Sequence, residues 1–209
     1  MNKVIVVDLD GTVIDSRKRS FELFRYLVGN RMTFDEYCSV KSSGIGNHEI
    51  LKDRIGWPLN LIQEFDKQWA SLIETSEWLQ FDELFPFTIH ALRQMINCHY
   101  DLWLVTARRN HSTLHHQLNH LNLIHYFKKI LMSKGVISKA ITISGEKKNE
   151  QIEYIVGDTE EEIAVAKELG IHSISVLSGA RNKDFLLQAG AQQIENSIED
   201  FASSLHYEF

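Results

Sequence analysis

Two aspartates, Asp8 and Asp10, stand directly after a short apolar run at residues 4–7. Side chains alternate along a β-strand, so both carboxylates are expected to point to the same side. Carboxylates that close repel each other unless a proton or a cation separates them. Mg²⁺ takes oxygen ligands and keeps several waters, which leaves room for a phosphate oxygen. Gly11 then permits a tight turn and a close approach of the backbone. The spacing predicts a metal-assisted site for phosphate chemistry.

Further polar side chains follow two other apolar runs. Thr106 ends the run at 102–105, and Asp158 ends the run at 155–156, with Glu162 four residues further on. Ligands of open α/β sheets bind beyond the carboxyl ends of the strands, so these groups are expected at one edge. Each also has a structural interpretation, Thr106 and Asp158 as helix caps and Glu162 as an acid in the first turn of a helix. The joint placement favours a functional role for Thr106 and Asp158 and leaves Glu162 open.

The elements that would position these groups are strands that alternate with helices. Five apolar runs are mostly continuous, as in strands buried on both faces of a parallel sheet. They are 4–7, 102–105, 130–132, 155–156 and 174–177. Helical spacing of apolar residues predicts helices at 89–96, 114–121 and 163–169. This alternation predicts an α/β protein with a doubly wound parallel sheet.

Residues 15–85 interrupt the alternation, because helical patterns dominate there and no strand stands out. We interpret this segment as a helical cap inserted over the sheet. The expected domains are therefore an α/β core at 1–14 and 86–209 and a cap at 15–85.

Composition and charge narrow the class of partner. The net charge of −6 disfavours a dedicated nucleic-acid binder, although a bound cation would still allow small anionic substrates. Cys38 and Cys98 belong to no metal-ligand pattern and are expected to be reduced thiols. The run at 4–7 is too short for a signal peptide or a membrane span. We expect a cytoplasmic protein that binds neither membrane nor nucleic acid.

Taken together, these motifs resemble the haloacid dehalogenase (HAD) superfamily over nearly the whole chain. The resemblance is carried by Asp8-Leu9-Asp10-Gly11-Thr12, by Thr106, by a following lysine and by Gly157-Asp158 with a trailing acid. The insert resembles the small helical cap of that family, the C1 type, and the tail at 179–191 resembles phosphoglycolate-phosphatase-like members. The resemblance implies a Rossmann-like HAD core.

The resemblance also implies a role for each matched residue. Asp8 would be the nucleophile that forms an aspartyl-phosphate, and Asp10 would serve as general acid and then as general base. Thr106 and a lysine would hold the phosphoryl oxygens. Mg²⁺ would be held by Asp8, Asp158 and the main-chain carbonyl of Asp10, with Glu162 as a further acid of the metal site.

The sequence offers more than one candidate for this lysine. Lys139 is our choice because of its distance after Phe127, and Lys134 is its close rival, with Lys147 and Lys148 as further alternatives. The family's lysine is commonly followed by proline, which this chain lacks after Pro86.

Substrate contacts are expected from both units of the protein. In the core they are Gly11, Thr106, Ala107 and Arg108, although a structural ion pair would also explain Arg108. In the cap, Gly44 and Asn47 lie where similar caps present a substrate-selecting loop.

Asp10 distinguishes between activities within the superfamily, because its dehalogenases and phosphonatases lack an aspartate there. The resemblance therefore implies a Mg²⁺-dependent phosphatase, a monomer or homodimer, that hydrolyses a small phosphate monoester. One alternative is a phosphomutase or other phosphotransferase with the same core residues. Another is a catalytically weak member that acts in binding or regulation.

Overall fold

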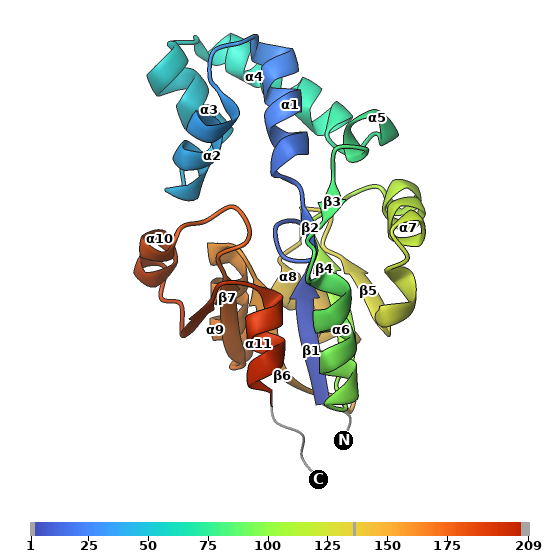
Figure 1. The fold of residues 1–209 in the computed structure, drawn as a ribbon. Helices are drawn as coiled ribbons and strands as arrows, with labels where there is room; N and C mark the ends of the chain where they lie inside the picture. Colours follow the sequence, from blue (N-terminus) through green and yellow to red (C-terminus); the bar gives the residue numbers. More distant parts are fainter. Residues whose placement is uncertain (1–2, 136, 206–209) are drawn as a thin grey trace.

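A computed structural model describes residues 3–135 and 137–205 of the chain (Figure 1). At its centre is a six-stranded sheet in the order β5-β4-β1-β6-β7-β8, in which every neighbouring pair is parallel. The strands are β1 (Lys3–Asp8), β4 (Asp101–Thr106), β5 (Lys129–Met132), β6 (Gln151–Gly157), β7 (His172–Val176) and β8 (Gln193–Glu195). From β1 the chain continues to β4 and β5 on one side, and it then crosses to β6, β7 and β8 on the other side.

The strand register brings the predicted functional residues level with one another. Asp8 pairs with Val105 of β4, and Val7 pairs with Val156 of β6. Thr106 and Asp158 each follow these partners by one or two residues, so they lie at the same edge as Asp8. This edge is the carboxyl end of the sheet at its switch of direction, where ligands of such folds bind.

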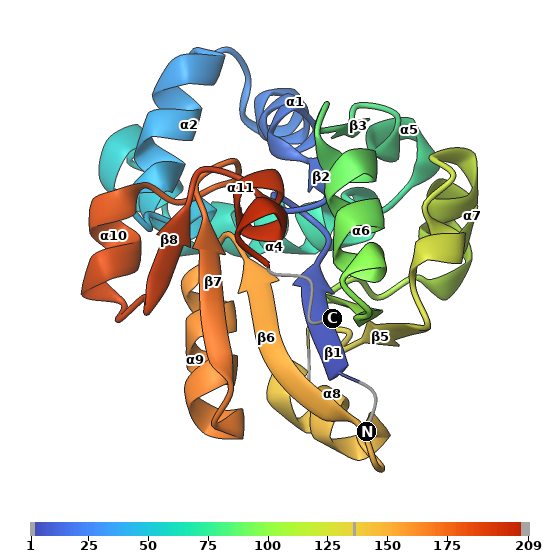
Figure 2. The same ribbon diagram turned by 60° about the horizontal axis from the view of Figure 1, so that its bottom comes forward.

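Alternate residues of the central strands enter two different cores, which is why these strands are apolar throughout. Ile5 and Val7 belong to one buried cluster, while Val4 and Val6 belong to the other. The first cluster includes residues of α6, α7 and α11, and the second includes residues of α8 and α9. Helices therefore cover both faces of the sheet (Figure 2). The core helices are α6 (Thr88–Asn97), α7 (His111–His120), the 3₁₀ turn η2 (Ile124–Tyr126), α8 (Lys139–Glu146), α9 (Glu160–Leu169), α10 (Lys183–Gln188) and α11 (Ile198–Ser204).

The cap helices lie beyond the carboxyl edge of the sheet and have a buried core of their own (Figure 1). Aromatic rings dominate that core, with Phe24 against both Tyr37 and Phe65. The cap helices are α1 (Arg17–Val28), α2 (Phe34–Ser42), α3 (Asn47–Glu49), the π-helical turn η1 (Ile50–Ile55), α4 (Leu59–Leu72) and α5 (Ser76–Leu79). Two short antiparallel strands, β2 (Ile14–Asp15) and β3 (Glu83–Leu84), connect these helices to the core.

The predicted fold class is confirmed: a doubly wound parallel sheet carries an inserted helical cap. All five predicted strands fall within β1, β4, β5, β6 and β7, apart from the last residue of the fifth run. Strand β8 and the ribbon of β2 and β3 were not predicted, and these strands are only two or three residues long. None of the described helices combines the length and the apolarity needed to cross a membrane.

Candidate active site

Asp8 and Lys139 form the centre of the site, although 131 positions separate them in the sequence. Asp8 ends β1 and is buried, and its Oδ1 accepts a hydrogen bond of 2.7 Å from the Lys139 ammonium. Lys139 is the first residue of α8, which begins after Ser138, whose side chain accepts a hydrogen bond from the Ile141 N–H. The start of this helix therefore sets the position from which the lysine reaches the end of β1.

Lys139 also binds two acids of the first turn of α9. Its ammonium donates to the buried carboxylate of Glu162 and lies 3.0 Å from that of Glu161. Burial lowers the pKa of Lys139, but the charges of Asp8 and Glu162 outweigh it and raise the pKa above its usual value. Burial raises the pKa of Asp8 well above its usual value, and the nearby Lys139 opposes that rise. The lysine therefore neutralises charge that burial would otherwise make costly.

Asp158 lies beside Asp8 in a space shaped by two glycines. A Cβ built at Gly11 would lie 2.2 Å from the Asp158 carboxylate, and one built at Gly179 would lie 2.1 Å from it. Gly11 also has a φ of +88°, which side chains with a Cβ rarely adopt. The Asp158 Oδ2 accepts a hydrogen bond of 2.6 Å from the Ala180 N–H. Burial first, and then the charge of Glu162, raise the pKa of Asp158 to about 7.

Asp10 makes a different set of contacts, because two arginines bind its carboxylate. Arg108 donates two hydrogen bonds of 2.7 Å, and Arg19 of α1 donates one of 2.6 Å. Burial favours the neutral carboxyl, but Arg108 and Arg19 outweigh it and hold the pKa of Asp10 below its usual range. Asp82 lies between the same two arginines, 3.3 Å from the Arg19 Nε and 3.2 Å from the Arg108 Nη2. Asp10 is therefore ionised and linked directly to a cap helix.

The remaining predicted substrate contacts are distributed over the core and the cap. Thr106 is buried, and its hydroxyl accepts a 3.3 Å hydrogen bond from the Arg108 N–H, while Ala107 is exposed. In the cap, Asn47 accepts a hydrogen bond of 3.0 Å from the Tyr37 hydroxyl. Gly44 packs against Phe185 of α10, so that a Cβ at Gly44 would lie 2.1 Å from the ring.

The rival lysines lie elsewhere. Lys134, Lys147 and Lys148 are all exposed, whereas Lys139 is buried against Asp8. Sequence reasoning missed Arg19 and Asp82, which contact Asp10 and its partner Arg108 from the cap side of the chain. Neither belongs to a motif, and their contacts span 9 positions for Arg19 with Asp10 and 26 for Asp82 with Arg108, so no local signal identifies them.

The donor set can be compared with the needs of Mg²⁺. The Asp158 Oδ1 is buried and accepts no hydrogen bond from the described residues, as expected of an atom kept for a cation. In the described part of the chain, no three acidic, histidine or cysteine side chains gather into a metal site by themselves. Glu162 is already bound by Lys139 and Thr159, and the Asp10 carboxylate by arginines. Asp8, which Lys139 binds through one oxygen, Asp158 and the Asp10 carbonyl form an all-oxygen set, and such a set fits Mg²⁺.

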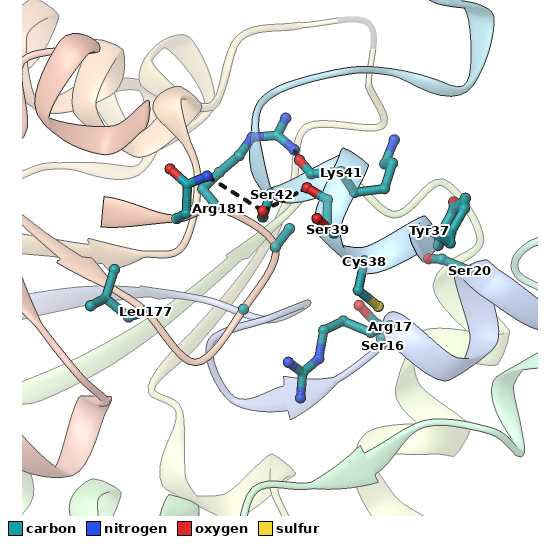
Figure 3. A pocket seen from close by; sticks show the side chains of 13 residues that line it. Ser16, Arg17, Ser20, Tyr37, Cys38, Ser39, Lys41, Ser42, Leu177 and Arg181 are labelled. Carbon is teal, nitrogen blue, oxygen red and sulfur yellow. Dashed lines mark hydrogen bonds between the residues drawn. The ribbon is translucent and has the colours of Figure 1, made fainter. Parts of the chain in front are cut away.

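A pocket of about 370 Å³ opens beside this site, between the cap and the core (Figure 3). Helices α1 and α2 line it on the cap side, and the loop after β7 lines it on the core side. Gly179 and Ala180 belong to that loop, so the pocket and the Asp158 carboxylate share a wall.

Comparison with known proteins decides the family. The sequence model described as haloacid dehalogenase-like hydrolase matches residues 5–176, which include every motif at the strand ends. The chain belongs to the haloacid dehalogenase-like hydrolase family. The resemblance inferred from the motifs is thereby confirmed. No curated protein gives a significant match to this hydrolase.

Solved structures of low sequence identity share the fold of this hydrolase. A haloacid dehalogenase-like hydrolase from Streptococcus pneumoniae is 22% identical, with a TM-score of 0.78 and 99% of each chain covered. A proposed phosphoglycolate phosphatase from Lactobacillus delbrueckii is 18% identical, with a TM-score of 0.73 and 99% of each chain covered. A proposed β-phosphoglucomutase from Thermotoga maritima is 20% identical, with a TM-score of 0.67 and 98% of each chain covered. The likeness extends over the cap as well as the core.

Proposed function

We propose that this hydrolase is a Mg²⁺-dependent phosphatase that cleaves small phosphate monoesters through an aspartyl-phosphate on Asp8. The observation that carries the proposal is the pairing of a buried Asp8 with Lys139 beside Asp158, whose free oxygen suits a cation. A nucleophile next to a fixed cation is suited to attack on an anionic phosphoryl group. Membership of a hydrolase family and likeness to structures named as phosphatases support the same class.

In the first step, an Asp8 oxygen forms a bond to phosphorus while the bond between phosphorus and the ester oxygen breaks. Lys139, which contacts Asp8, and the buried Thr106 hydroxyl would bind phosphoryl oxygens at the same edge of the sheet. The departing oxygen takes a proton from the carboxyl of Asp10 when the leaving group is a poor one. Asp8, Asp158 and the Asp10 carbonyl would hold Mg²⁺, which would supply a Lewis acid to offset the negative charge of the phosphoryl group.

In the second step, water attacks phosphorus and loses its proton to Asp10, which regenerates Asp8 and releases phosphate. Arg19 and Arg108 hold Asp10 ionised, and an ionised carboxylate is the form that a general base requires. The same arginines oppose the protonated form needed in the first step. Because Arg19 belongs to α1 of the cap, a movement of the cap changes the set of charges around Asp10.

We further propose that Glu162 positions Lys139 and does not bind the metal directly. Its carboxylate oxygens accept hydrogen bonds from the Lys139 ammonium and the Thr159 hydroxyl. The division into a core at 1–14 and 86–209 and a cap at 15–85 remains our proposal. A cytoplasmic location and a monomer or homodimer that binds neither membrane nor nucleic acid remain predictions from the sequence.

Hydrolysis of an aryl phosphate tests the proposed class, because an aryl leaving group needs no proton. Wild-type protein and Asp8→Asn are compared with Mg²⁺ and with EDTA. The proposal expects turnover by the wild type only with the metal and a loss of at least a hundredfold in Asp8→Asn. Full metal-dependent activity in Asp8→Asn would contradict the assignment of the nucleophile.

A phosphotransferase is a second candidate, favoured by the likeness to the proposed β-phosphoglucomutase. Asp8, Lys139 and Asp158 would act in the same way, but a sugar hydroxyl would take the phosphoryl group in place of water. Product analysis with a sugar phosphate separates the two. Free phosphate indicates hydrolysis, and an isomeric sugar phosphate indicates transfer.

A further inference from the structure

The pocket between the cap and the core is built from cationic and hydroxyl side chains (Figure 3). Arg17, Lys41 and Arg181 line it, and no acidic residue is among the residues that do. Four serines add hydroxyl groups to the wall, and they are Ser16, Ser20, Ser39 and Ser42. A protein with a net charge of −6 thus brings three cationic side chains to one cavity beside its reaction centre. Such a cavity attracts anions.

The three cations differ in what they already bind. Arg17 pairs with Asp15, and Arg181 pairs with Glu160 through hydrogen bonds of 2.8 and 2.9 Å. Lys41 has no carboxylate at ion-pair distance within the described residues, and its ammonium makes one long hydrogen bond of 3.4 Å to Asn47. Lys41 is therefore the cation of the pocket whose bonding capacity is least used.

The surroundings of Lys41 disfavour a positively charged ammonium that has no anionic partner. Burial first, and then the nearby charge of Arg181, lower the pKa of Lys41 to about 8, and the charges of Glu49 and Glu160 offset only part of this change. An anionic group in the pocket would relieve both effects.

The position of the pocket relates it to the substrate. Its core wall includes Gly179 and Ala180, which contact the Asp158 carboxylate of the candidate metal site. Its cap wall is held to that loop by Arg181, which donates to the Lys41 carbonyl, and by the Asn182 N–H, which donates to the Ser42 carbonyl. These bonds fix Lys41 on the cap wall of the pocket, against the loop whose residues contact Asp158.

We propose that the substrate carries a second anionic group, a carboxylate or a phosphate, which Lys41 binds in this pocket while the scissile phosphate lies at Asp8. The inference rests on the proposed phosphatase function and specifies its substrate class. It separates phosphate esters that carry a second anionic group from phosphate esters of uncharged sugars of similar size. The serine hydroxyls and Lys41 together suit either anion, because both accept several hydrogen bonds.

The test measures binding in the Asp8→Asn protein with Mg²⁺, so that no turnover is needed. Calorimetry compares three ligands of one backbone: ethylene glycol monophosphate, phosphoglycolate and ethylene glycol bisphosphate. We expect phosphoglycolate, the bisphosphate or both to bind at least tenfold more tightly than the monophosphate. Which of the two binds more tightly identifies the second anion. Equal affinity for all three ligands would overturn the inference.

A pair of lysine variants in the same background assigns the effect to Lys41. Lys41→Met should reduce the preference for a second anion to less than threefold, and Lys41→Arg should restore it. Lys67→Met is the matched control, because Lys67 is an exposed lysine of α4 outside the pocket. A preference that survives Lys41→Met would also overturn the inference.

The result of the ligand series is distinguishable from the result of the assay that tests the proposed function. Aryl phosphate turnover that depends on Asp8 tests catalysis and involves no second anion. The ligand series tests only the pocket. Catalysis without a binding preference refutes the inference alone, whereas a Lys41-dependent preference without catalysis refutes the phosphatase and leaves an anion-binding pocket.

Discussion

Replacement of Lys139 by methionine tests the electrostatic centre of the site. Methionine keeps a long unbranched side chain but removes the charge that lies 2.7 Å from Asp8 and also contacts Glu162. Asp8, Lys139 and Glu162 are all nearly inaccessible to solvent, so little water is available to replace the lost hydrogen bonds. The substitution leaves buried carboxylates without their cation.

Loss of one partner of a buried ion pair costs about 3–5 kcal/mol of folding stability. With a urea dependence of about 2 kcal/mol per molar, the unfolding midpoint of Lys139→Met in EDTA should fall by about 1.5–2.5 M. Burial has already raised the pKa of Asp8, and removal of Lys139 should raise it further. Aryl phosphate turnover should also fall roughly a hundredfold, as for the loss of one donor to a developing oxyanion.

The control is Lys134→Met, the other lysine that the sequence offers. Lys134 is exposed, so its replacement should change stability by no more than about 0.5 kcal/mol. Urea unfolding in EDTA and initial-rate assays with Mg²⁺ measure both variants. A Lys139→Met protein that loses less than about 1 kcal/mol and retains its turnover would refute the reasoning, because a buried charge left without its partner should cost several times more.

Three further predictions concern the contact of Gly44 with Phe185, the Asp158 carboxylate and the neighbouring Gly179. Gly44→Ala would place a Cβ 2.1 Å from the Phe185 ring at a residue whose φ is +83°. It should therefore raise the KM for the phosphate ester, and a second substitution, Phe185→Ala, should reverse part of that increase. An unchanged KM would argue against this contact in the active form. The pKa of Asp158 is raised to about 7, so its contribution to the stability of the metal-free protein is fully present below about pH 4 and is lost as the pH rises from there through 7. Urea midpoints in EDTA should therefore fall between about pH 4 and pH 7, with a flatter profile in Asp158→Asn, and an identical profile in that variant would contradict the assignment. Gly179→Ala would place a Cβ 2.1 Å from Asp158, so calorimetry should show at least a tenfold weaker Mg²⁺ affinity, whereas Gly145→Ala, with no atom within 4 Å of its Cβ, should bind Mg²⁺ as the wild type does.

The core of the fold was predictable because the physics that forms it is local. A strand covered by helices on both faces must be apolar at successive positions, and the five runs read from the sequence carry that signature. The acids that follow such runs are expected at the carboxyl edge, and the register places Asp8 level with the end of β6. The edge strand β8 was not predictable in this way, because its three residues are only partly buried and two are polar.

Contacts between the cap and the core could not be predicted, because they depend on where two distant segments meet. The contact between Arg108 of the core and Asp82 of the cap spans 26 positions, and neither Arg19 nor Asp82 belongs to a recognisable motif. The choice between Lys139 and Lys134 depended in the same way on the start of α8. Ser138 was a usable signal for that start, because serine is a favoured residue before the first turn of a helix.

Detection of the phosphorylated enzyme tests the central claim most directly. Wild-type protein with Mg²⁺ and an aryl phosphate is quenched in acid during turnover, digested and mapped by mass spectrometry. The account predicts one added phosphoryl group on the peptide that contains Asp8, and none on that peptide from Asp8→Asn or from the wild type in EDTA. Steady turnover with a phosphoryl group on another residue, or with none on Asp8 under conditions that trap acyl phosphates, would contradict the account.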